Sequence, residues 1–319
     1  MSNASATDRK PGFQGVMRAY EKISAVLPPT PLHRCEIAGR TVWCKAESLQ
    51  PIGAFKLRGA WHRLTDLSEA ERRSGVVAFS SGNHAQGVAW AAEKLGIAAT
   101  IVMPDDAPGL KVERTRALGA ELVFYDRMTG DRVGIAQKLA DERGAIVVPS
   151  FDDPWIIEGQ GSAGIEAMEQ LGFEPDMLVS PCGGGGLVSG LALALPGAEV
   201  VFGEPEGWDD MCRSLAGGEI VPVGPNPPPT SCDALQTLKV SPLTFGILAA
   251  RRARGFAVSE AGVGAAMKFA HEKMGLVLEP GGAVGLAVLL SGKVEPARRT
   301  LVVLSGGNVE PAVFERMTA

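Results

Sequence analysis

Between residues 75 and 150 the chain alternates short apolar runs with longer stretches in which apolar residues recur every three or four positions. The apolar runs predict strands over 75–80, 98–104, 120–126 and 145–150, and the periodic stretches predict helices over 83–96, 109–119 and 131–144. Nearly continuous apolar strands separated by helices are typical of parallel sheets that helices cover on both faces. The region therefore predicts a series of βαβ units.

The same alternation returns in the second half of the chain. It predicts strands over 176–181, 198–205 and 299–307, and a helix over 187–195. We expect an α/β protein with two lobes of open parallel sheet: a small domain over 69–149, inserted in a large domain formed by 1–68 and 150–319. Ligands of open α/β sheets bind at the carboxyl ends of the strands, so the active site is expected between the lobes.

Composition narrows the classes of partner. With 319 residues, of which 45% are hydrophobic, the chain can bury a large core. Its formal charge of -5 and isoelectric point near 5.5 argue against nucleic acid or an anionic membrane as the main partner. The polar start "MSNASATDRKPGFQG" does not resemble a signal peptide, so we expect a cytoplasmic protein.

Two glycine-rich motifs could lie against ligands or neighbouring helices. "SPCGGGGLVSGLA" follows a predicted strand and precedes a predicted helix, where glycine N–H groups and the helix dipole favour a phosphate. A flexible turn is the alternative interpretation. "GQGSAG", residues 159–164, matches a dinucleotide-binding pattern but follows no clear strand, so we interpret it as a closely packed helix start.

Two further turns combine short polar side chains with glycine. "FSSGNHAQG" joins a predicted strand to a predicted helix, where free N–H groups could bind a carboxylate, although simple helix capping explains it equally well. "VLSGGNV" ends a strand near the C-terminus, and by itself it indicates only a turn.

Lys56 lies among apolar residues in "QPIGAFKLRGAWHRL". Most lysines are solvated, with the stem of the side chain along the surface. A lysine that burial keeps uncharged is instead a nucleophile that can form a Schiff base. A phosphate-binding turn together with such a lysine suggests pyridoxal phosphate, which carries both an aldehyde and a phosphate.

Five motifs in this order, "GAFKLRGA", "SSGNHAQG", "CGGGGLVSG", "LEPGGAVGLA" and "LSGGNV", resemble the fold type II pyridoxal phosphate enzymes, whose fold is like that of tryptophan synthase β. The serine/threonine dehydratase and serine racemase branch is the most similar. The resemblance runs from about Thr30 to Pro311 and implies a homodimer that acts on a small amino acid.

The resemblance also implies a role for individual residues. Lys56 would hold the cofactor as a Schiff base and then act as the catalytic base, and Ser81 would be a second acid or base on the opposite face. The cofactor would further contact Phe55, Asn83, Gly183, Gly184, Gly185, Gly186, Leu187 and Ser305. The substrate would contact Ser80, Ser81, Asn83, His84 and Arg132.

"GEPEGWDDM" resembles the divalent cation site of this branch. Glu204 and Asp210 would supply carboxylates and Trp208 a carbonyl, a set of oxygen ligands that suits Mg²⁺, Ca²⁺ or Mn²⁺. A solvated acidic loop is the alternative.

The resemblance implies an ammonia-lyase that converts a β-hydroxy amino acid such as threonine or serine to a 2-oxo acid and ammonia. Arg132 keeps 3-hydroxyaspartate open as a substrate, and Trp61, Phe151 and Trp155 keep phenylserine open. Serine racemase is a further alternative, and a ligand-binding protein without activity is a remote one.

Overall fold

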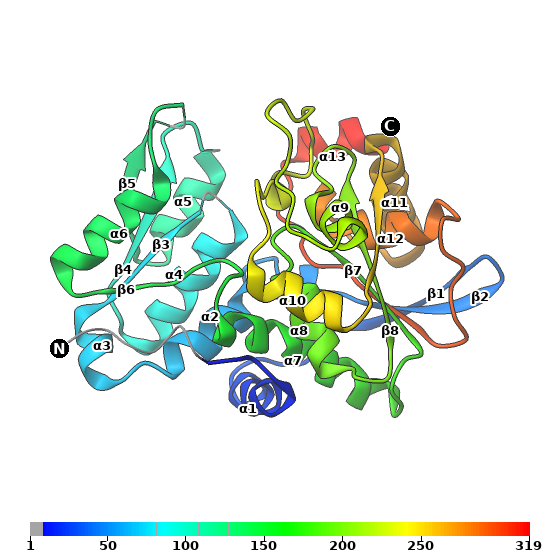
Figure 1. Ribbon diagram of the computed structural model, residues 1–319, viewed down its shortest axis with the longest axis horizontal. Helices are drawn as coiled ribbons and strands as arrows, with labels where there is room; N and C mark the ends of the chain where they lie inside the picture. The colour runs from blue at the N-terminus through cyan, green and yellow to red at the C-terminus, as the bar shows by residue number, and fades with distance from the viewer. Residues whose placement is uncertain (1–8, 81, 108, 127) are drawn as a thin grey trace.

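The computed structural model describes residues 9–80, 82–107, 109–126 and 128–319, and it contains two open sheets (Figure 1). The larger sheet has six strands in the order β1-β2-β10-β7-β8-β9, and all neighbours except β1 and β2 are parallel. Its strands are β1 (Leu32–Ile37), β2 (Arg40–Lys45), β7 (Met177–Pro181), β8 (Glu199–Pro205), β9 (Arg254–Val258) and β10 (Thr300–Val303).

The smaller sheet has four parallel strands in the order β5-β4-β3-β6. They are β3 (Val76–Phe79), β4 (Ala99–Pro104), β5 (Glu121–Tyr125) and β6 (Ile146–Val147). All four fall within the residues predicted to form the inserted domain, although the domain boundaries themselves stay a prediction. The predicted fold class, α/β with two lobes of parallel sheet, is confirmed.

Helices cover both sheets, with α3 to α6 around the smaller one on the left of Figure 1. The α-helices are α1 (Phe13–Ser24), α2 (Lys56–Thr65), α3 (Glu69–Ser74), α4 (Asn83–Leu95), α5 (Gly109–Ala117), α6 (Arg132–Arg143), α7 (Pro154–Leu171), α8 (Gly186–Ala194), α9 (Asp210–Gly217), α10 (Pro242–Ala250), α11 (Glu260–Met274), α12 (Pro280–Leu290) and α13 (Pro311–Thr318). Two short 3-10 helices, η1 (Glu47–Leu49) and η2 (Asp233–Leu235), complete the described elements. None of the described helices is both long and apolar enough to span a bilayer.

The glycines of "GQGSAG" lie inside α7 rather than at its start, so that prediction is wrong. α7 begins at Pro154, because the Asp153 side chain caps it by accepting the Ile156 N–H at 2.9 Å. The predicted close packing is present: a Cβ on Gly161 would lie 2.4 Å from the Gly190 carbonyl oxygen in α8.

Helix α2, which carries Lys56 at its first position, packs against both α4 and α7. Arg58 of α2, which is fully buried, donates to both carboxylate oxygens of Glu47 at 2.7 and 2.8 Å. The same guanidinium donates to Glu166 of α7 at 2.9 Å. Bidentate pairs of this kind fix direction as well as distance, so they hold the start of α2 in one place.

Candidate active site

A cavity of about 680 Å³ lies where the strand ends of the two sheets face each other. From the smaller sheet it is lined by residues that follow β3 and β6, such as Ser80 and Pro149, and from the larger sheet by residues that follow β7 and β10, such as Gly183 and Ser305. Carboxyl ends of parallel strands are where open α/β sheets bind ligands. The cavity therefore lies where the sequence placed the active site.

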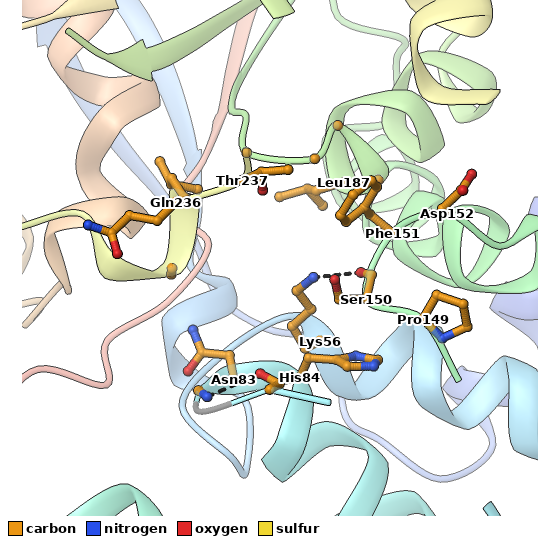
Figure 2. Close-up of a pocket in the computed structure, with 18 of the residues that line it drawn as sticks. Lys56, Asn83, His84, Pro149, Ser150, Phe151, Asp152, Leu187, Gln236 and Thr237 are labelled. Atoms are coloured by element: carbon orange, nitrogen blue, oxygen red, sulfur yellow. Dashed lines mark hydrogen bonds between the residues drawn. The ribbon is translucent and has the colours of Figure 1, made fainter. Parts of the chain in front are cut away.

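Lys56 projects into this cavity from the start of α2 (Figure 2). Its Nζ donates to the carbonyl oxygen of Ser150 at 2.7 Å and lies 5.3 Å from the centroid of the Phe55 ring. Burial, with no carboxylate to offset it, lowers the pKa of Lys56 to about 8. A lysine amine with that pKa keeps an uncharged, nucleophilic fraction at neutral pH.

Of the four glycines 183–186, the first three lie between β7 and α8 and Gly186 begins α8, so the motif joins a strand to a helix as predicted. Gly185 has a φ of +86° at the N-cap of α8, a conformation that favours glycine. A Cβ on Gly184 would lie 2.3 Å from the Phe151 ring, so a side chain has no room there. The turn thus presents bare backbone at a helix N-terminus, which suits a phosphate.

The turn that carries Ser305 lies beside the residues before Lys56, although some 250 positions separate the two in sequence. The Phe55 N–H donates to the Ser305 carbonyl oxygen at 3.1 Å, and Ala54 and Gly306 form an isolated β-bridge. Phe55, Leu187 and the buried Ser305 all line the cavity. A ring bound against Lys56 would therefore meet an aromatic face and a hydroxyl.

Asn83, at the first position of α4, lines the same cavity and is 7% exposed. Its Nδ2 donates to Glu279 at 2.6 Å and its Oδ1 accepts from Asn308 at 2.7 Å. Burial, strengthened by the nearby Asp233, raises the pKa of Glu279 to about 8. The Glu279 carboxyl group therefore holds a proton more readily than that of a solvated glutamate.

Two of the residues predicted to bind the substrate, Ser80 and His84, lie at the start of α4. Both line the cavity at the N-terminus of α4, where the N-cap residue Gly82 has no side chain that could accept from the first N–H groups. His84 Nε2 lies 2.9 Å from the Val148 carbonyl oxygen, and burial lowers its pKa to about 3, so the ring is neutral and Nε2 donates. Ser81 lies outside the described residues, so its predicted role stays a prediction.

Arg132, at the start of α6, lines the cavity. Its guanidinium carbon lies 5.9 Å from the centroid of the Phe79 ring, and no carboxylate among the described residues forms an ion pair with it. By contrast Lys111, which also lines the cavity, is paired with Asp233. Arg132 therefore offers an unpaired cation to a ligand.

The residues predicted to bind a cation lie together away from this cavity, at β8 and the start of α9. Glu204 accepts the N–H groups of Met211 and Cys212 at 3.2 and 2.8 Å, and Asp210 Oδ2 accepts that of Val240 at 2.9 Å. Burial raises the pKa of Glu204 to about 8 and that of Asp210 to about 6.

No three acidic, histidine or cysteine side chains within the described ranges converge to hold a metal ion. Asp210 Oδ1, however, is buried without a hydrogen-bond partner among those residues. A buried carboxylate oxygen without a partner, next to a second carboxylate, is suited to binding a cation. The Trp208 carbonyl would be the third ligand. The cation site stays a prediction.

Sequence reasoning missed Glu279, which lines the cavity, and Asn308, which contacts Asn83. Both stand in quoted motifs, and a lone glutamate before the proline of an apolar helix was the available signal for Glu279. Of the three aromatic residues predicted to shape the substrate pocket, Phe151 lines the cavity. Trp61 and Trp155 are not among the described residues that line it.

These features together are those of an enzyme that holds a cofactor with both an aldehyde and a phosphate. The family model described as "Pyridoxal-phosphate dependent enzyme" matches residues 23–306. L-threo-3-hydroxyaspartate ammonia-lyase from a Pseudomonas species is 41% identical over 93% of this chain and 95% of its own. L-threonine ammonia-lyase from Thermotoga maritima is 38% identical over 88% of this chain and 71% of its own.

The structure of maize serine racemase is also similar, with a TM-score of 0.90 and 31% identity over 97% of each chain. This chain therefore belongs to the family of pyridoxal-phosphate dependent enzymes. The predicted fold type, the cofactor and the branch of dehydratases and serine racemases are confirmed.

Proposed function

We propose that the chain is an ammonia-lyase that removes water from a β-hydroxy amino acid and releases a 2-oxo acid and ammonia. The observation that carries the proposal is the Lys56 amine, which lies in the cavity with a single carbonyl partner and a pKa lowered to about 8. The bound cofactor supplies a ring that takes up the electron pair released when the substrate Cα loses its proton.

We assign the holding of that cofactor to six parts of the site. Lys56 would form the covalent link, and the turn 183–186 with Leu187 would bind the phosphate. Phe55 would pack on the ring, Asn83 would donate to its phenolic oxygen, and the hydroxyl of Ser305 would lie by its nitrogen. A hydroxyl, unlike a carboxylate, would leave that nitrogen largely unprotonated, which suits an elimination, because the leaving group carries the negative charge away.

In the reaction, the substrate amino group would displace Lys56 from the covalent link, and the freed, uncharged Lys56 amine would take the proton from the substrate Cα. The Cα–H and Cβ–O bonds break, and the β-hydroxyl leaves as water with one proton gained, which balances the proton that Lys56 removes. The enamine that remains takes up a proton to become an imine, which water hydrolyses to the 2-oxo acid and ammonia. Ser80 and the N–H groups at the start of α4, beside neutral His84, bind the α-carboxylate.

For the substrate we propose 3-hydroxyaspartate, because Arg132 offers the cavity an unpaired cation that suits a second carboxylate. The 41% identical relative from Pseudomonas, an L-threo-3-hydroxyaspartate ammonia-lyase, supports this choice. Threonine or serine is the second candidate, favoured by Phe151, whose ring lies against Gly184 and gives the cavity an apolar wall.

A panel of amino acids tests the proposal. Purified holoenzyme is incubated with L-threo-3-hydroxyaspartate, L-threonine, L-serine and phenylserine, and the 2-oxo acid, ammonia and D-amino acid are measured. We expect most 2-oxo acid from 3-hydroxyaspartate. Accumulation of D-amino acid without 2-oxo acid would indicate a racemase, and a colourless protein that takes up no pyridoxal phosphate would indicate a ligand-binding protein.

We also propose that Glu204, Asp210 and the carbonyl of Trp208 bind Mg²⁺, Ca²⁺ or Mn²⁺, supported by the unpaired oxygen of buried Asp210. A chelator should then lower the thermal stability of the holoenzyme, and added Mg²⁺ should restore it. Unchanged stability after removal of divalent cations would contradict the site. The homodimer and the cytoplasmic location remain predictions from the sequence.

A further inference from the structure

The Asn83 amide is held at both of its ends by other side chains. Its Oδ1 accepts a hydrogen bond from Asn308 Nδ2 at 2.7 Å, and its Nδ2 donates to Glu279 Oε1 at 2.6 Å. A planar amide has its donors and its acceptor on opposite sides, so fixing the oxygen toward Asn308 fixes the NH₂ group toward Glu279. One hydrogen of that NH₂ group remains for a ligand in the cavity, which Asn83 lines.

The amide of Asn308 is fixed in turn. Its Nδ2 also donates to the Ile52 carbonyl oxygen at 2.7 Å, so both of its hydrogens are used. Its Oδ1 lies close to the backbone of Gly53, where a Cβ would be only 2.4 Å from that oxygen. If the amide flipped, its oxygen would face two other acceptor oxygens, which is unfavourable.

The remaining partner of Asn308 comes from a different part of the fold. Arg114, on the exposed face of α5 beside the smaller sheet, donates from Nη1 to Asn308 Oδ1 at 2.9 Å. A guanidinium has only donors, so it accepts just one of the two orientations of the Asn308 amide. A chain of hydrogen bonds therefore runs from Arg114 through Asn308 and Asn83 to Glu279.

We infer that Arg114 is a positioning residue: through Asn308 it orients the Asn83 amide so that the NH₂ group faces the cofactor. This inference rests on the proposed function, because it takes Asn83 to donate to the phenolic oxygen of bound pyridoxal phosphate. It assigns a role to an exposed arginine that does not line the cavity. Loss of its donor removes the hydrogen bond at Asn308 Oδ1 and leaves only the Ile52 carbonyl and Asn83 to hold the orientation of the Asn308 amide.

Three single variants of the full chain test the inference: Arg114→Ala, Arg114→Lys, and Arg116→Ala as the matched control. Arg116 is exposed on the same helix and carries the same charge. We expect Arg114→Ala to lower kcat about fivefold, which corresponds to about 1 kcal/mol, with little change in KM for the amino acid.

The absorbance spectrum of the bound cofactor gives a readout that general loss of stability would not move. The hydrogen bond to the phenolic oxygen affects where the ring system holds its proton, so Arg114→Ala should change the ratio of the visible to the near-ultraviolet band. Arg114→Lys, which keeps a donor, should restore part of the ratio, and Arg116→Ala should match the parent.

A double-mutant cycle tests whether Arg114 acts through Asn308. If it does, Arg114→Ala has no further effect on kcat or on the spectrum in the Asn308→Ala background. Additive effects would overturn the relay, and so would an Arg114→Ala spectrum equal to that of Arg116→Ala. Should Asn308→Ala fail to fold, that comparison of single variants decides alone.

Failure of the relay and failure of the proposed function have different signatures. A parent protein that takes up no pyridoxal phosphate contradicts the proposed function. An active, coloured parent whose Arg114→Ala variant has an unchanged spectrum contradicts only the relay.

Discussion

Two lysines eleven positions apart, Lys45 fully buried and Lys56 partly buried, have different surroundings. Lys45, at the end of β2, donates from Nζ to Glu166 at 2.5 Å, to Gln170 at 2.7 Å and to the Thr30 carbonyl oxygen at 2.8 Å. Lys56 Nζ donates to one carbonyl oxygen and has no carboxylate partner among the described residues.

The contrast separates a structural cation from a chemical one. Burial lowers the pKa of both lysines, but at Lys45 the carboxylates of Glu47 and Glu166 oppose that effect. All three donors of the Lys45 ammonium are used, so it holds chain segments together. The Lys56 amine is available to react because no carboxylate among the described residues stabilises its charge. Burial alone is therefore no sign of catalysis, whereas burial without a counter-charge in a cavity is.

Replacing Lys56 should have the largest effect on activity. Lys56→Ala removes both the covalent link and the base, so formation of 2-oxo acid should fall by about 10⁴-fold and the yellow colour of the holoenzyme should be lost. The measurements are the turnover rate and the visible absorbance after addition of pyridoxal phosphate. Lys94→Ala, at an exposed lysine of α4, serves as control. Normal turnover by Lys56→Ala would refute the assignment.

Replacing Lys45 should have the converse result. Lys45→Met leaves carboxylates buried with one cation fewer, so the free energy of unfolding should fall by about 3 kcal/mol, while kcat per folded molecule stays within a factor of about two. Urea unfolding and active-site titration measure the two quantities.

The exposed pair between Lys22 and Asp66, at 2.8 Å, provides the matched control for stability. Lys22→Met should cost less than about 1 kcal/mol, because solvent screens such pairs. A Lys45→Met variant as stable as Lys22→Met would contradict the structural role assigned to Lys45 and so the contrast with Lys56.

Arg132, like Lys56, is a cation without a carboxylate partner among the described residues, and its replacement should change the preference for substrate. Arg132→Gln keeps polarity but removes the unpaired cation, so kcat/KM for 3-hydroxyaspartate should fall about 30-fold, or about 2 kcal/mol. The value for threonine should stay nearly constant, and the ratio of the two substrates is its own control. If both values fall together, Arg132 supports the cavity without selecting the substrate.

The smallest effect concerns pH. Because the pKa of Lys56 is about 8, the uncharged fraction of its amine should rise tenfold for each pH unit below that value and level off above it. The rate at which apoenzyme takes up pyridoxal phosphate should follow this profile in stopped-flow absorbance. A rate that keeps rising toward pH 10 would show that the Lys56 amine has the pKa of a solvated lysine.

The sequence predicted those strands and helices whose own residues show a clear apolar pattern. The fully apolar run Ala99–Pro104 is a strand buried on every residue, and the helix that starts at Asn83 ends at Leu95, before Gly96 in the left-handed conformation. Strands β1, β2 and β9 were missed because they are partly exposed and mix charged with apolar residues. Strand β6 is shorter than predicted because only Ile146 and Val147 pair with β3.

At the site, the sequence predicted the residues that belong to short motifs. It did not predict the residues whose role depends on a partner far along the chain. Nothing near Lys45 in sequence indicates Glu166, which lies 121 positions away. Likewise Arg114 and Asn308 meet across 194 positions, and no local pattern marks an exposed arginine as the partner of a cavity residue. Such contacts depend on how the two sheets are placed, which periodicity does not specify.

The most direct test of the account is to locate the covalent attachment of the cofactor. Holoenzyme is reduced with borohydride, which makes the link between the cofactor and the amine permanent, and digested peptides are mapped by mass spectrometry. The account predicts one modified residue, Lys56, in the peptide that contains "GAFKLR", with Lys45 and Lys111 unmodified. Modification of a different lysine, or of none in a coloured and active enzyme, would contradict it.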